Sequence, residues 1–562
     1  RRLCDHFGHS SVLAVGYVGW SSVLTIPLLF PLVGFMVLEY GVAHDRGDAG
    51  YFAGILASAF MIGRMLTAVV WGGVADHFGI IRILTLCTVF SAGFTVAVGF
   101  VDSYMQAIAF RIATGLMNPV IALVKGVLPS LVQPSEQHRA MSVITAQWQF
   151  GLITGPAIGG FLAYPCGNPF AHAEGASEGS EWLQEGGALG SLLCSRPFLL
   201  PCTVCGLIQL SGLVPLLLLV APRVRAVAKA PPVDTPVSTV NSSDLQKTVA
   251  ADEGNGGTGR RGRQQYSQLP EQLDSEADRG TEEASEEVEV EAASPEGTPE
   301  IQTCKSNREK HWFFGNWQCR RVVWVYCMLS FFAIAADEIT SLWLLAPLAK
   351  GGLEVDPVDI GTVLSASGIG CLFFQLTVGP RLVERIGLCN AVRTGVLSFG
   401  LAVMSVPFLP QLFGLQVDEG SDTLRRRLIL GAAATSTLWR HCSTYLCFSS
   451  IFVLVNNSVA PAYRGRVNGL AMTLASLAKA VGPSTGTMIL AWSLSANHAF
   501  PFDHHVSFLL LGAIALATGF LFVPTIPRRL QQPFAIESAV GTVGKSESQD
   551  NDEEPAEKAA KV

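Results

Sequence analysis

Two acids and one lysine lie deep within long apolar segments of this 562-residue chain. Asp337 and Glu338 are adjacent in the segment 322–349, and Lys479 lies at a similar depth in the segment 467–494. A charge at the centre of a bilayer costs from about 2.5 kcal/mol upward, and such residues commonly mark proton relays or substrate sites. We therefore expect Asp337 or Glu338 to bind a coupling proton. Lys479 would pair with an acid or bind an anionic group of a substrate.

The structural alternative is that one of these acids only neutralises a buried base. Adjacent helical positions point about 100° apart, so Asp337 and Glu338 cannot face one point, and at least one should face the protein interior. Arg111, also within an apolar segment, is a weaker candidate for proton coupling. Four amides in apolar segments are weaker candidates for lining a substrate cavity: Gln147, Gln149, Asn456 and Asn457.

The composition places these residues in membrane-spanning helices. The chain is 49% hydrophobic and 15% charged, whereas soluble domains carry about 25% charged residues. An apolar run of about 18 residues is long enough to cross a membrane as a helix. We predict an all-α polytopic membrane protein with twelve transmembrane helices, the tenth of which could begin as early as Leu428: 12–37, 51–71, 83–101, 105–131, 140–163, 197–222, 322–349, 358–379, 392–413, 442–460, 467–494 and 505–526.

A polar linker divides the chain into two halves of six helices each. Its residues 271–296 contain eleven acids and one arginine, a composition typical of disorder. Basic residues are concentrated in the connections on one side of the membrane. This bias identifies the cytosolic side and places both termini and the linker there. Segments 165–196 and 414–440 then lie outside, with Arg425, Arg426 and Arg427 as an exception to the charge rule. The predicted parts are an N-terminal half at 1–222, the linker at 223–320, a C-terminal half at 321–527 and a disordered tail at 528–562.

The two halves repeat each other. Pro134, Arg139, Gly155, Pro156 and Gly159 recur 327 residues later as Pro461, Arg466, Gly482, Pro483 and Gly486. Earlier in each half the offset is shorter: Gly72 matches Gly379, while Asp76 and Gly79 match Glu384 and Gly387. An insertion within the long segment 414–440 would explain the difference in offset.

The turn "WGGVADHFGIIR" (71–82) joins the second and third predicted spans on the cytosolic side. Its glycines allow close approach and a sharp turn, and Asp76 and Arg82 could pair in one conformation and separate in another. The stretch resembles the cytoplasmic loop signature of the major facilitator superfamily, although Ile80 and Ile81 stand where basic residues usually follow. The resemblance implies a gating role for this turn and for its counterpart: Gly72, Asp76, Gly79, Arg82, Gly379, Glu384 and Gly387.

The fifth predicted span contains "GLITGPAIGG" (151–160), which resembles the signature of the proton-coupled drug antiporters in that superfamily. The motif residues are Gly151, Gly155, Pro156, Gly159 and Gly160. A plain helix-packing motif is the alternative, since small residues four apart are common in membrane helices. "FRIATG", which includes Arg111, resembles the arginine motif of the fourth antiporter span.

Across nearly all spans the chain resembles the zinc-induced facilitator branch most. The likeness rests on "FPLVGFMV" (30–37), "YFAGILASAFMIGRMLTAVVWGGVAD" (51–76), "ADEITSLW" (336–343) and "RGRVNGLAMTLASLAKAVGP" (464–483). The cysteine-rich C-P-G-C element of the plant proteins is absent from the visible start, so transport of zinc or metal chelators is not carried over.

Together these resemblances imply a major facilitator fold and a secondary transporter that exports a small organic solute, in exchange for protons. The alternatives are a solute:proton symporter, disfavoured because 220–229 lacks a P-E-S-P-R element, and a non-transporting sensor with the same fold. We expect no enzyme activity, cofactor, metal or nucleic-acid partner, and a monomer in the plasma or vacuolar membrane. Cys202 and Cys205 are interpreted as buried thiols, and the pair His504–His505 as interfacial side chains.

Overall fold

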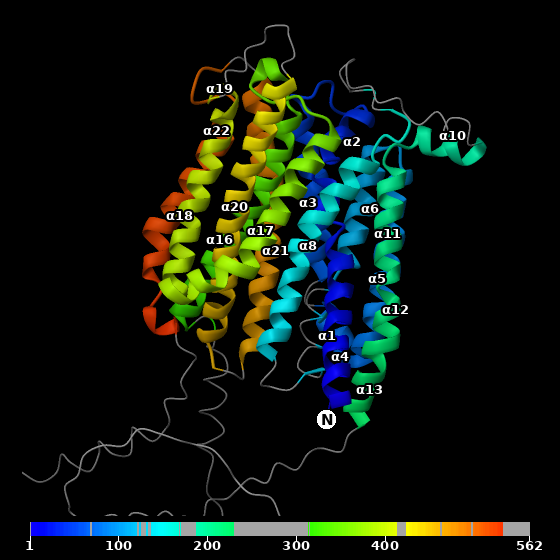
Figure 1. Ribbon diagram of the computed structural model, residues 1–562, viewed down its shortest axis with the longest axis vertical. Helices are drawn as coiled ribbons and strands as arrows, with labels where there is room; N and C mark the ends of the chain where they lie inside the picture. Colours follow the sequence, from blue (N-terminus) through cyan, green and yellow to red (C-terminus); the bar gives the residue numbers. More distant parts are fainter. Residues whose placement is uncertain are drawn as a thin grey trace, which may run out of the picture. The chain divides into compact units, whose positions relative to one another are not determined.

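The computed structural model describes residues 2–67, 70–120, 137–167, 187–229, 315–412, 423–460, 463–495 and 498–531, with a few single residues between them. The predicted linker interior and most of the C-terminal tail lie outside these ranges. Arg1–Ala228 and Glu309–Val562 belong to one compact unit. Every regular element among the described residues is a helix (Figure 1).

The helices of the first half follow the predicted apolar segments. Within a membrane, a helix makes all its backbone hydrogen bonds internally, so long apolar runs adopt this structure. Short breaks at proline or glycine divide some of them. In chain order they are α1 (Arg2–Val23), η1 (Pro27–Leu29), α2 (Val33–Glu39), α3 (Ala49–Thr67), α4 (Val70–Phe78), α5 (Ile80–Phe100), α6 (Tyr104–Leu116), α8 (Gln137–Leu162), α10 (Gly187–Ser195), α11 (Leu199–Ser211), α12 (Leu213–Pro215), η2 (Leu216–Val220) and α13 (Ala221–Lys229).

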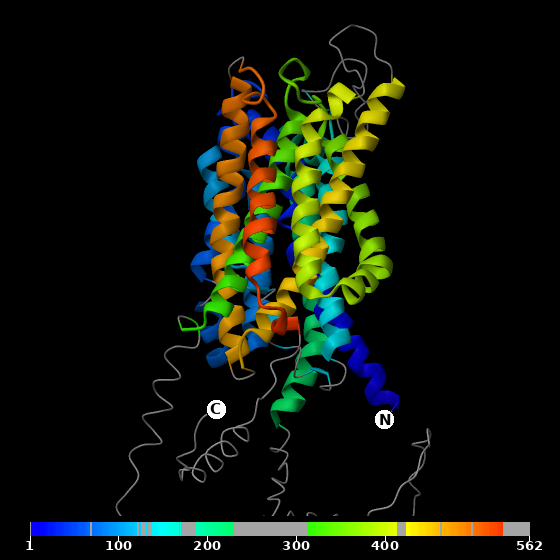
Figure 2. The ribbon, with the colours of Figure 1, turned by 90° about the vertical axis from the view of Figure 1, so that its left-hand side faces the viewer.

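The helices of the second half lie beside those of the first half (Figure 2). They are α16 (Trp317–Leu345), η3 (Leu348–Lys350), α17 (Pro357–Ile386), α18 (Leu388–Ser405), η4 (Val406–Phe408), α19 (Leu409–Leu412), α20 (Thr423–Asn457), α21 (Arg464–Ser495), α22 (Val506–Ala517), η6 (Thr518–Phe522), η7 (Val523–Thr525) and η8 (Arg528–Gln531).

Nine helical segments among the described residues are long and apolar enough to cross a membrane. They correspond to nine of the predicted spans. The predicted fourth, fifth and eleventh spans correspond to α6, α8 and α21. α6 is described over only 13 residues, and α8 and α21 contain the polar residues that lower their hydropathy. The predicted all-α membrane fold is confirmed.

The tenth span begins well before residue 442, close to its alternative start at Leu428. Its apolar segment runs from Arg427 to Asn457 within α20, which begins at Thr423, so residues 423–440 are helical and do not form an outer loop. The hydropathy of this stretch is interrupted by Arg440 and His441, both of which are buried in the structure. Buried charges are tolerated where other parts of the protein neutralise them, and that compensation is not visible in the local sequence.

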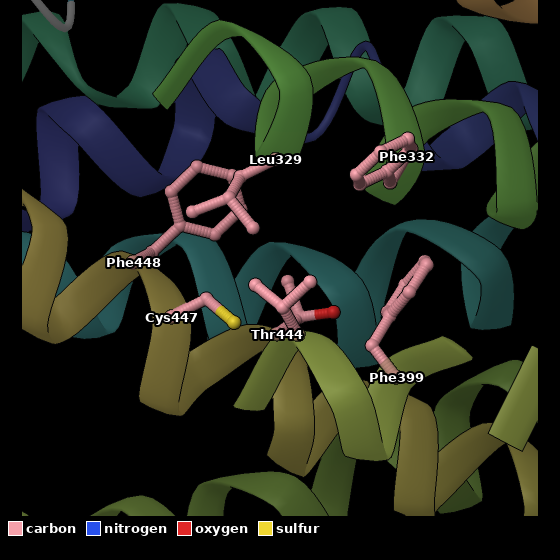
Figure 3. Close-up of a pocket in the computed structure, with 7 residues that line it drawn as sticks. Leu329, Phe332, Phe399, Thr444, Cys447 and Phe448 are labelled. Carbon is pink, nitrogen blue, oxygen red and sulfur yellow. The ribbon is translucent and has the colours of Figure 1, made fainter. Parts of the chain in front are cut away.

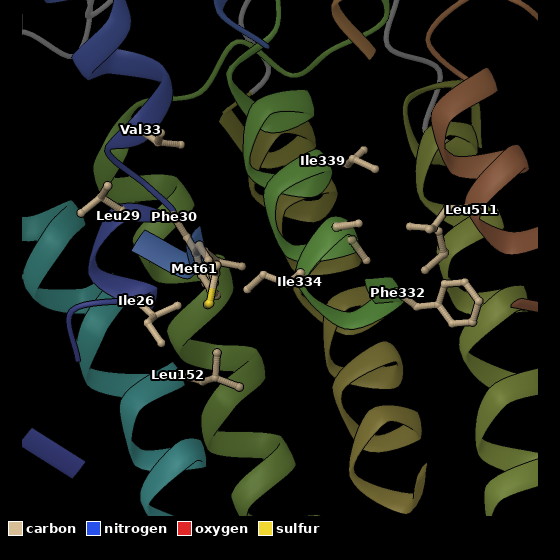
Figure 4. Close-up of a cluster of buried hydrophobic side chains, with 14 of the residues drawn as sticks. Ile26, Leu29, Phe30, Val33, Met61, Leu152, Phe332, Ile334, Ile339 and Leu511 are labelled. Atoms are coloured by element: carbon tan, nitrogen blue, oxygen red, sulfur yellow. The ribbon is translucent and has the colours of Figure 1, made fainter. Parts of the chain in front are cut away.

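The two halves meet along α3 with α21 and α8 with α17. At these junctions small residues let the backbones approach closely. A Cβ atom on Gly54 of α3 would lie 2.9 Å from the carbonyl oxygen of Pro483, and one on Gly361 of α17 would lie 2.6 Å from that of Pro156. One cluster of buried apolar side chains extends through both halves (Figure 4) and includes Leu29, Met61, Ile334 and Ile339.

Candidate functional site

The site contains the acidic pair of α16, which lies twenty residues after the first residue of the helix and eight before its last. Asp337 is 5% exposed and Glu338 is 3% exposed. As the helical geometry predicted, the two carboxyl groups have different neighbours. Asp337 faces α20 in its own half, and Glu338 interacts with a charge from the other half.

Asp337 makes a buried ion pair with Arg440 of α20. Nη1 of Arg440 donates to Oδ1 of Asp337 at 2.6 Å, and Nε2 of His441 lies 3.3 Å from the same oxygen. Nδ1 of His441 lies 3.2 Å from Oγ of Ser367 on α17. These contacts tie α16, α17 and α20 together, and because desolvated charges need such partners, the cluster fixes the register of the three helices.

The sequence did not identify Arg440 and His441 as site residues because both lie just before the predicted start of the tenth span at 442. The base paired with Asp337 is thus Arg440 and not the expected Lys479. Lys479 instead holds its Nζ 5.4 Å from the ring centroid of Trp148 on α8 and 5.9 Å from that of Phe448 on α20, which are cation–π distances. Two adjacent ionisable residues after an apolar run, at 440 and 441, were the signal that could have identified the pair.

Glu338 interacts electrostatically with Arg111 of α6 across the junction of the halves. Its Oε2 is buried and accepts no hydrogen bond from the described residues. Arg111 is 4% exposed. Its Nη1 donates to the carbonyl oxygen of Thr25 at 3.0 Å, and its guanidinium lies 5.0 Å from the ring centroid of Phe60. Of the predicted proton-coupling candidates, Glu338 and Arg111 therefore interact with each other, whereas Asp337 is paired with Arg440.

The amide candidates fall into two places. Gln147 and Gln149 of α8 are buried, and the side-chain oxygen of each lacks a hydrogen-bond partner among the described residues. Asn456 and Asn457 instead lie at the end of α20, where Asn457 donates to the carbonyl of Leu530 and Asn456 accepts from Asn468. Those bonds hold helix ends together and do not reach the acidic pair.

The two matched turns have the same backbone. Gly79 lies between α4 and α5 with φ of 91°, and Gly387 lies between α17 and α18 with φ of 80°. Residues other than glycine rarely adopt such angles. Gly72, Arg82 and Glu384 are exposed, and Gly379 packs against the ring of Tyr445. The side chain of Asp76 lies outside the described residues, so its pairing with Arg82 stays a prediction.

The glycine motif of α8 packs on two sides. Gly151, Gly155 and Gly159 lie one turn apart against the end of α1 and η1, where a Cβ on Gly155 would be 2.7 Å from Cγ of Pro27. Gly160 lies instead against Pro357 and Gly361 of the other half. Pro156 lies inside the helix and contributes the carbonyl that Gly361 approaches. The motif thus joins α8 to its own half and to α17.

Polar contacts also join the two halves near the helix ends that were predicted to lie on the non-cytosolic side of the membrane. Nζ of Lys350 lies 3.1 Å from Oδ2 of Asp45, and Nη1 of Arg46 lies 3.9 Å from Oε1 of Glu354. Farther in, Ser58 and Ser484 hydrogen-bond at 2.8 Å. We refer to Asp45, Arg46, Lys350 and Glu354 as the outer ion pairs.

The predicted outer segment 165–196 contains a disulfide between Cys166 and Cys194. The sequence did not predict this bond. Disulfides persist in oxidising compartments, so this bond agrees with placing the segment outside the cytosol. Cys202 and Cys205 are buried free thiols, as predicted.

A small apolar cavity lies within the second half, between α16, α18 and α20 (Figure 3). It is lined by Leu329, Phe332, Val396, Phe399, Thr444, Cys447 and Phe448. Its volume of about 10 Å³ corresponds to about one water molecule, which is too small for an organic solute.

Comparisons with known proteins agree with this architecture. A family model described as Major Facilitator Superfamily matches residues 28–483. Protein ZINC INDUCED FACILITATOR 1 of Arabidopsis thaliana is 29% identical, over 90% of this chain and 89% of that protein. The Major facilitator superfamily multidrug transporter mfsB of Aspergillus fumigatus is 24% identical, over 84% of this chain and 76% of that protein. The crystal structure of a D-xylose-proton symporter aligns with a TM-score of 0.54 at 14% identity, covering 94% of this chain and 98% of that one, and shows the shared fold.

Two repeated sets of membrane helices around a buried charge cluster define a multi-pass membrane transporter. The chain belongs to the Major Facilitator Superfamily. The predicted fold and the resemblance to zinc-induced facilitators and multidrug transporters are confirmed. The relatives and structural neighbours are transporters of small molecules and not enzymes, as expected.

Proposed function

We propose that this transporter exchanges a small organic solute for protons and that Glu338 is the principal proton-binding group. The observation that carries the proposal is the difference between the two acids. Both oxygens of a buried carboxylate normally need hydrogen bonds, yet Oε2 of Glu338 accepts none from the described residues. A proton can therefore bind there without breaking a hydrogen bond, whereas protonation of Asp337 would disrupt its contacts with Arg440 and His441.

The position of Glu338 would couple proton binding to movement of the halves. In this superfamily the substrate site lies between two halves that rock about it. The guanidinium of Arg111 attracts the carboxylate of Glu338 but not its neutral acid, and the two residues belong to different halves. Proton binding would release this attraction, and proton loss would restore it. Exchange follows if solute binding is possible only after the proton has left.

Glu338→Gln tests this assignment in proteoliposomes. A panel of drugs, organic acids and metal chelates is first screened to find a transported solute, and its pH-driven uptake is then compared with its counterflow. The variant should lose uptake driven by a pH gradient and retain counterflow, because exchange of solute for solute needs no net proton movement. Asp337→Asn is the matched variant, and we expect it to impair both measurements by breaking the ion pair. Unchanged pH-driven uptake in Glu338→Gln contradicts the assignment.

Proton movement during transport distinguishes the alternatives. Solute entry should alkalise the vesicle interior for antiport and acidify it for symport. A sensor would bind a solute of the panel without moving it.

We also propose that residues 223–320 are a cytosolic tether and that the protein acts as a monomer in the plasma or vacuolar membrane. Deleting residues 240–300 should leave transport intact if the segment is only a tether.

A further inference from the structure

Three potential metal ligands gather between α21 and α22, away from the central charge cluster. Asp503, His504 and His505 each offer one ligand atom, and these atoms lie within 4.8 Å of one another. Nδ1 of His505 lies 2.8 Å from Oδ1 of Asp503, and Nδ1 of His504 lies 3.6 Å from Oδ2. Two imidazoles therefore direct a nitrogen towards opposite oxygens of one carboxylate.

The spacing of these atoms suits a transition-metal ion. Zinc binds histidine nitrogen at about 2.0–2.1 Å and carboxylate oxygen at about 2.0–2.2 Å, so tetrahedral ligand atoms lie roughly 3.3 Å apart. The observed separations bracket this value, and rotation of one side chain would equalise them. Two imidazoles and one carboxylate also leave a fourth position for water, as in many zinc sites.

The surroundings hold both imidazoles in place. His505 is 1% exposed and packs between the rings of Phe408 and Phe500, at 4.6 and 5.4 Å between centroids. The backbone of Pro407, whose only hydrogen-bonding group is its carbonyl, adjoins the ring of His504. Metal-binding histidines usually donate their second N–H to such an oxygen, which fixes the ring.

The cluster also adjoins the outer ion pairs. The ring of His504 lies directly against the backbone at Gly351, where a Cβ atom would overlap it. Gly351 follows Lys350, the partner of Asp45 in the other half. The indole N–H of Trp343 donates to the carbonyl of Gly351 at 2.9 Å. A ligand that fixes His504 would therefore also fix the segment that carries Lys350 and Glu354.

We infer that Asp503, His504 and His505 bind one divalent transition-metal ion of the zinc class and that the bound ion stiffens the segment 346–355. The sequence alone favoured an interfacial role for the histidine pair. The inference rests on what the structure adds: the shared carboxylate, the buried ring of His505 and the proline carbonyl at His504. It does not depend on proton coupling.

Titration of the purified full-length protein with zinc chloride, followed by calorimetry, tests the site. The wild type should bind one ion per chain through this cluster, and His505→Ala should weaken that binding at least tenfold. His504→Gln serves as a milder variant in case the buried substitution fails to fold. His498→Ala is the matched control, because His498 lies in the same connection but stacks on Trp492. Equal affinity in the wild type and in both cluster variants overturns the site.

Hydrogen exchange tests the second part without any transported solute. Zinc should slow backbone exchange across 346–355 several-fold in the wild type and in His498→Ala, but not in His505→Ala, since local opening becomes rarer when a ligand binds the closed form. Exchange that stays unchanged across 346–355 while zinc binds overturns the claim that the ion stiffens this segment.

Discussion

Arg440 of α20 donates a 2.6 Å hydrogen bond to Asp337 of α16, although the residues are 103 positions apart and neither is more than 5% exposed. His441 adds a second contact to the same carboxylate oxygen. The sequence left open that one of the two acids only neutralises a buried base, and Asp337 is that acid. Glu338 interacts instead with Arg111 of the other half.

Removing the base should therefore destabilise the fold strongly. Arg440→Met leaves Asp337 as a buried charge without its ion-pair partner, a change that costs about 3–5 kcal/mol. Much of this loss should return in the double variant Arg440→Met with Asp337→Asn, because the charge left behind is then neutral. Thermal unfolding in detergent measures both effects. Single and double variants of equal stability would mean that the pair contributes little.

The sequence was sufficient to find the acids but not their partner. The length of the apolar segments predicted the helices, and the matching glycines at 79 and 387 predicted two equivalent turns, which the structure has. Arg440 precedes the predicted start of the tenth span at 442 because a hydropathy average counts its charge as unfavourable, whereas the alternative start at Leu428 would include it. The compensating residue Asp337 lies on another helix, so only the tertiary structure shows that the charge is tolerated.

The same reason explains two other omissions. Cys166 and Cys194 are 28 residues apart, and no spacing rule links two such cysteines in a long outer segment. The ion pair between Asp45 and Lys350 joins two halves whose relative position no local pattern gives. Periodicity and composition report what one segment buries, whereas these contacts depend on which segments become neighbours.

The outer ion pairs should bias the protein towards the conformation described here. Lys350→Met removes the partner of Asp45 and should make the junction of α3 and α21 more accessible. Exposed ion pairs contribute about 0–1 kcal/mol, so we expect an increase of at most about fivefold in the opening equilibrium. The reaction of Ser484→Cys with an impermeant thiol reagent, in a background without reactive cysteines, measures it. Lys350→Arg is the control and should react as the parent does. An unchanged rate in Lys350→Met would exclude a role in closure.

This interface should also weaken in acid. Burial acts to raise the pKa of Asp45, but hydrogen bonds from the backbone of Asp48 and from Lys350 outweigh it and hold the pKa below its usual value. A lowered pKa in the closed state means that the stabilisation is present above a pH of about 3.9 and is lost as the pH falls through the lowered value. Because the thiolate is the reactive form, the rate at Ser484→Cys is divided by that of a fully exposed cysteine at the same pH. This ratio should rise in strong acid and depend less on pH in Lys350→Met. Equal pH dependence in both proteins would contradict this attribution.

The matched turns should govern the rate of conformational exchange. Asp76→Asn should lower the maximum transport rate more than it changes KM, because the turn lies between helices and not among the buried charges. Glu384→Gln at the equivalent turn should act in the same direction but more weakly. Transport kinetics in proteoliposomes separate the two parameters. A change confined to KM in both variants would show that these turns affect solute binding instead.

Lys479 should select for negatively charged solutes. Its Nζ lies over Trp148 of the first half and Phe448 of the second, so a carboxylate bound there would contact residues from both sides of the junction. Lys479→Met should raise KM for transported organic acids about tenfold or more, the effect of losing roughly 1.4 kcal/mol of binding, and leave organic cations unaffected. Lys479→Arg retains the charge and should recover most of the affinity, whereas a structural role would impair transport of both classes alike.

Because Arg440 already neutralises Asp337, Lys479→Met should destabilise the protein far less than Arg440→Met. Similar unfolding temperatures for these two variants would indicate that Lys479 also neutralises a buried acid.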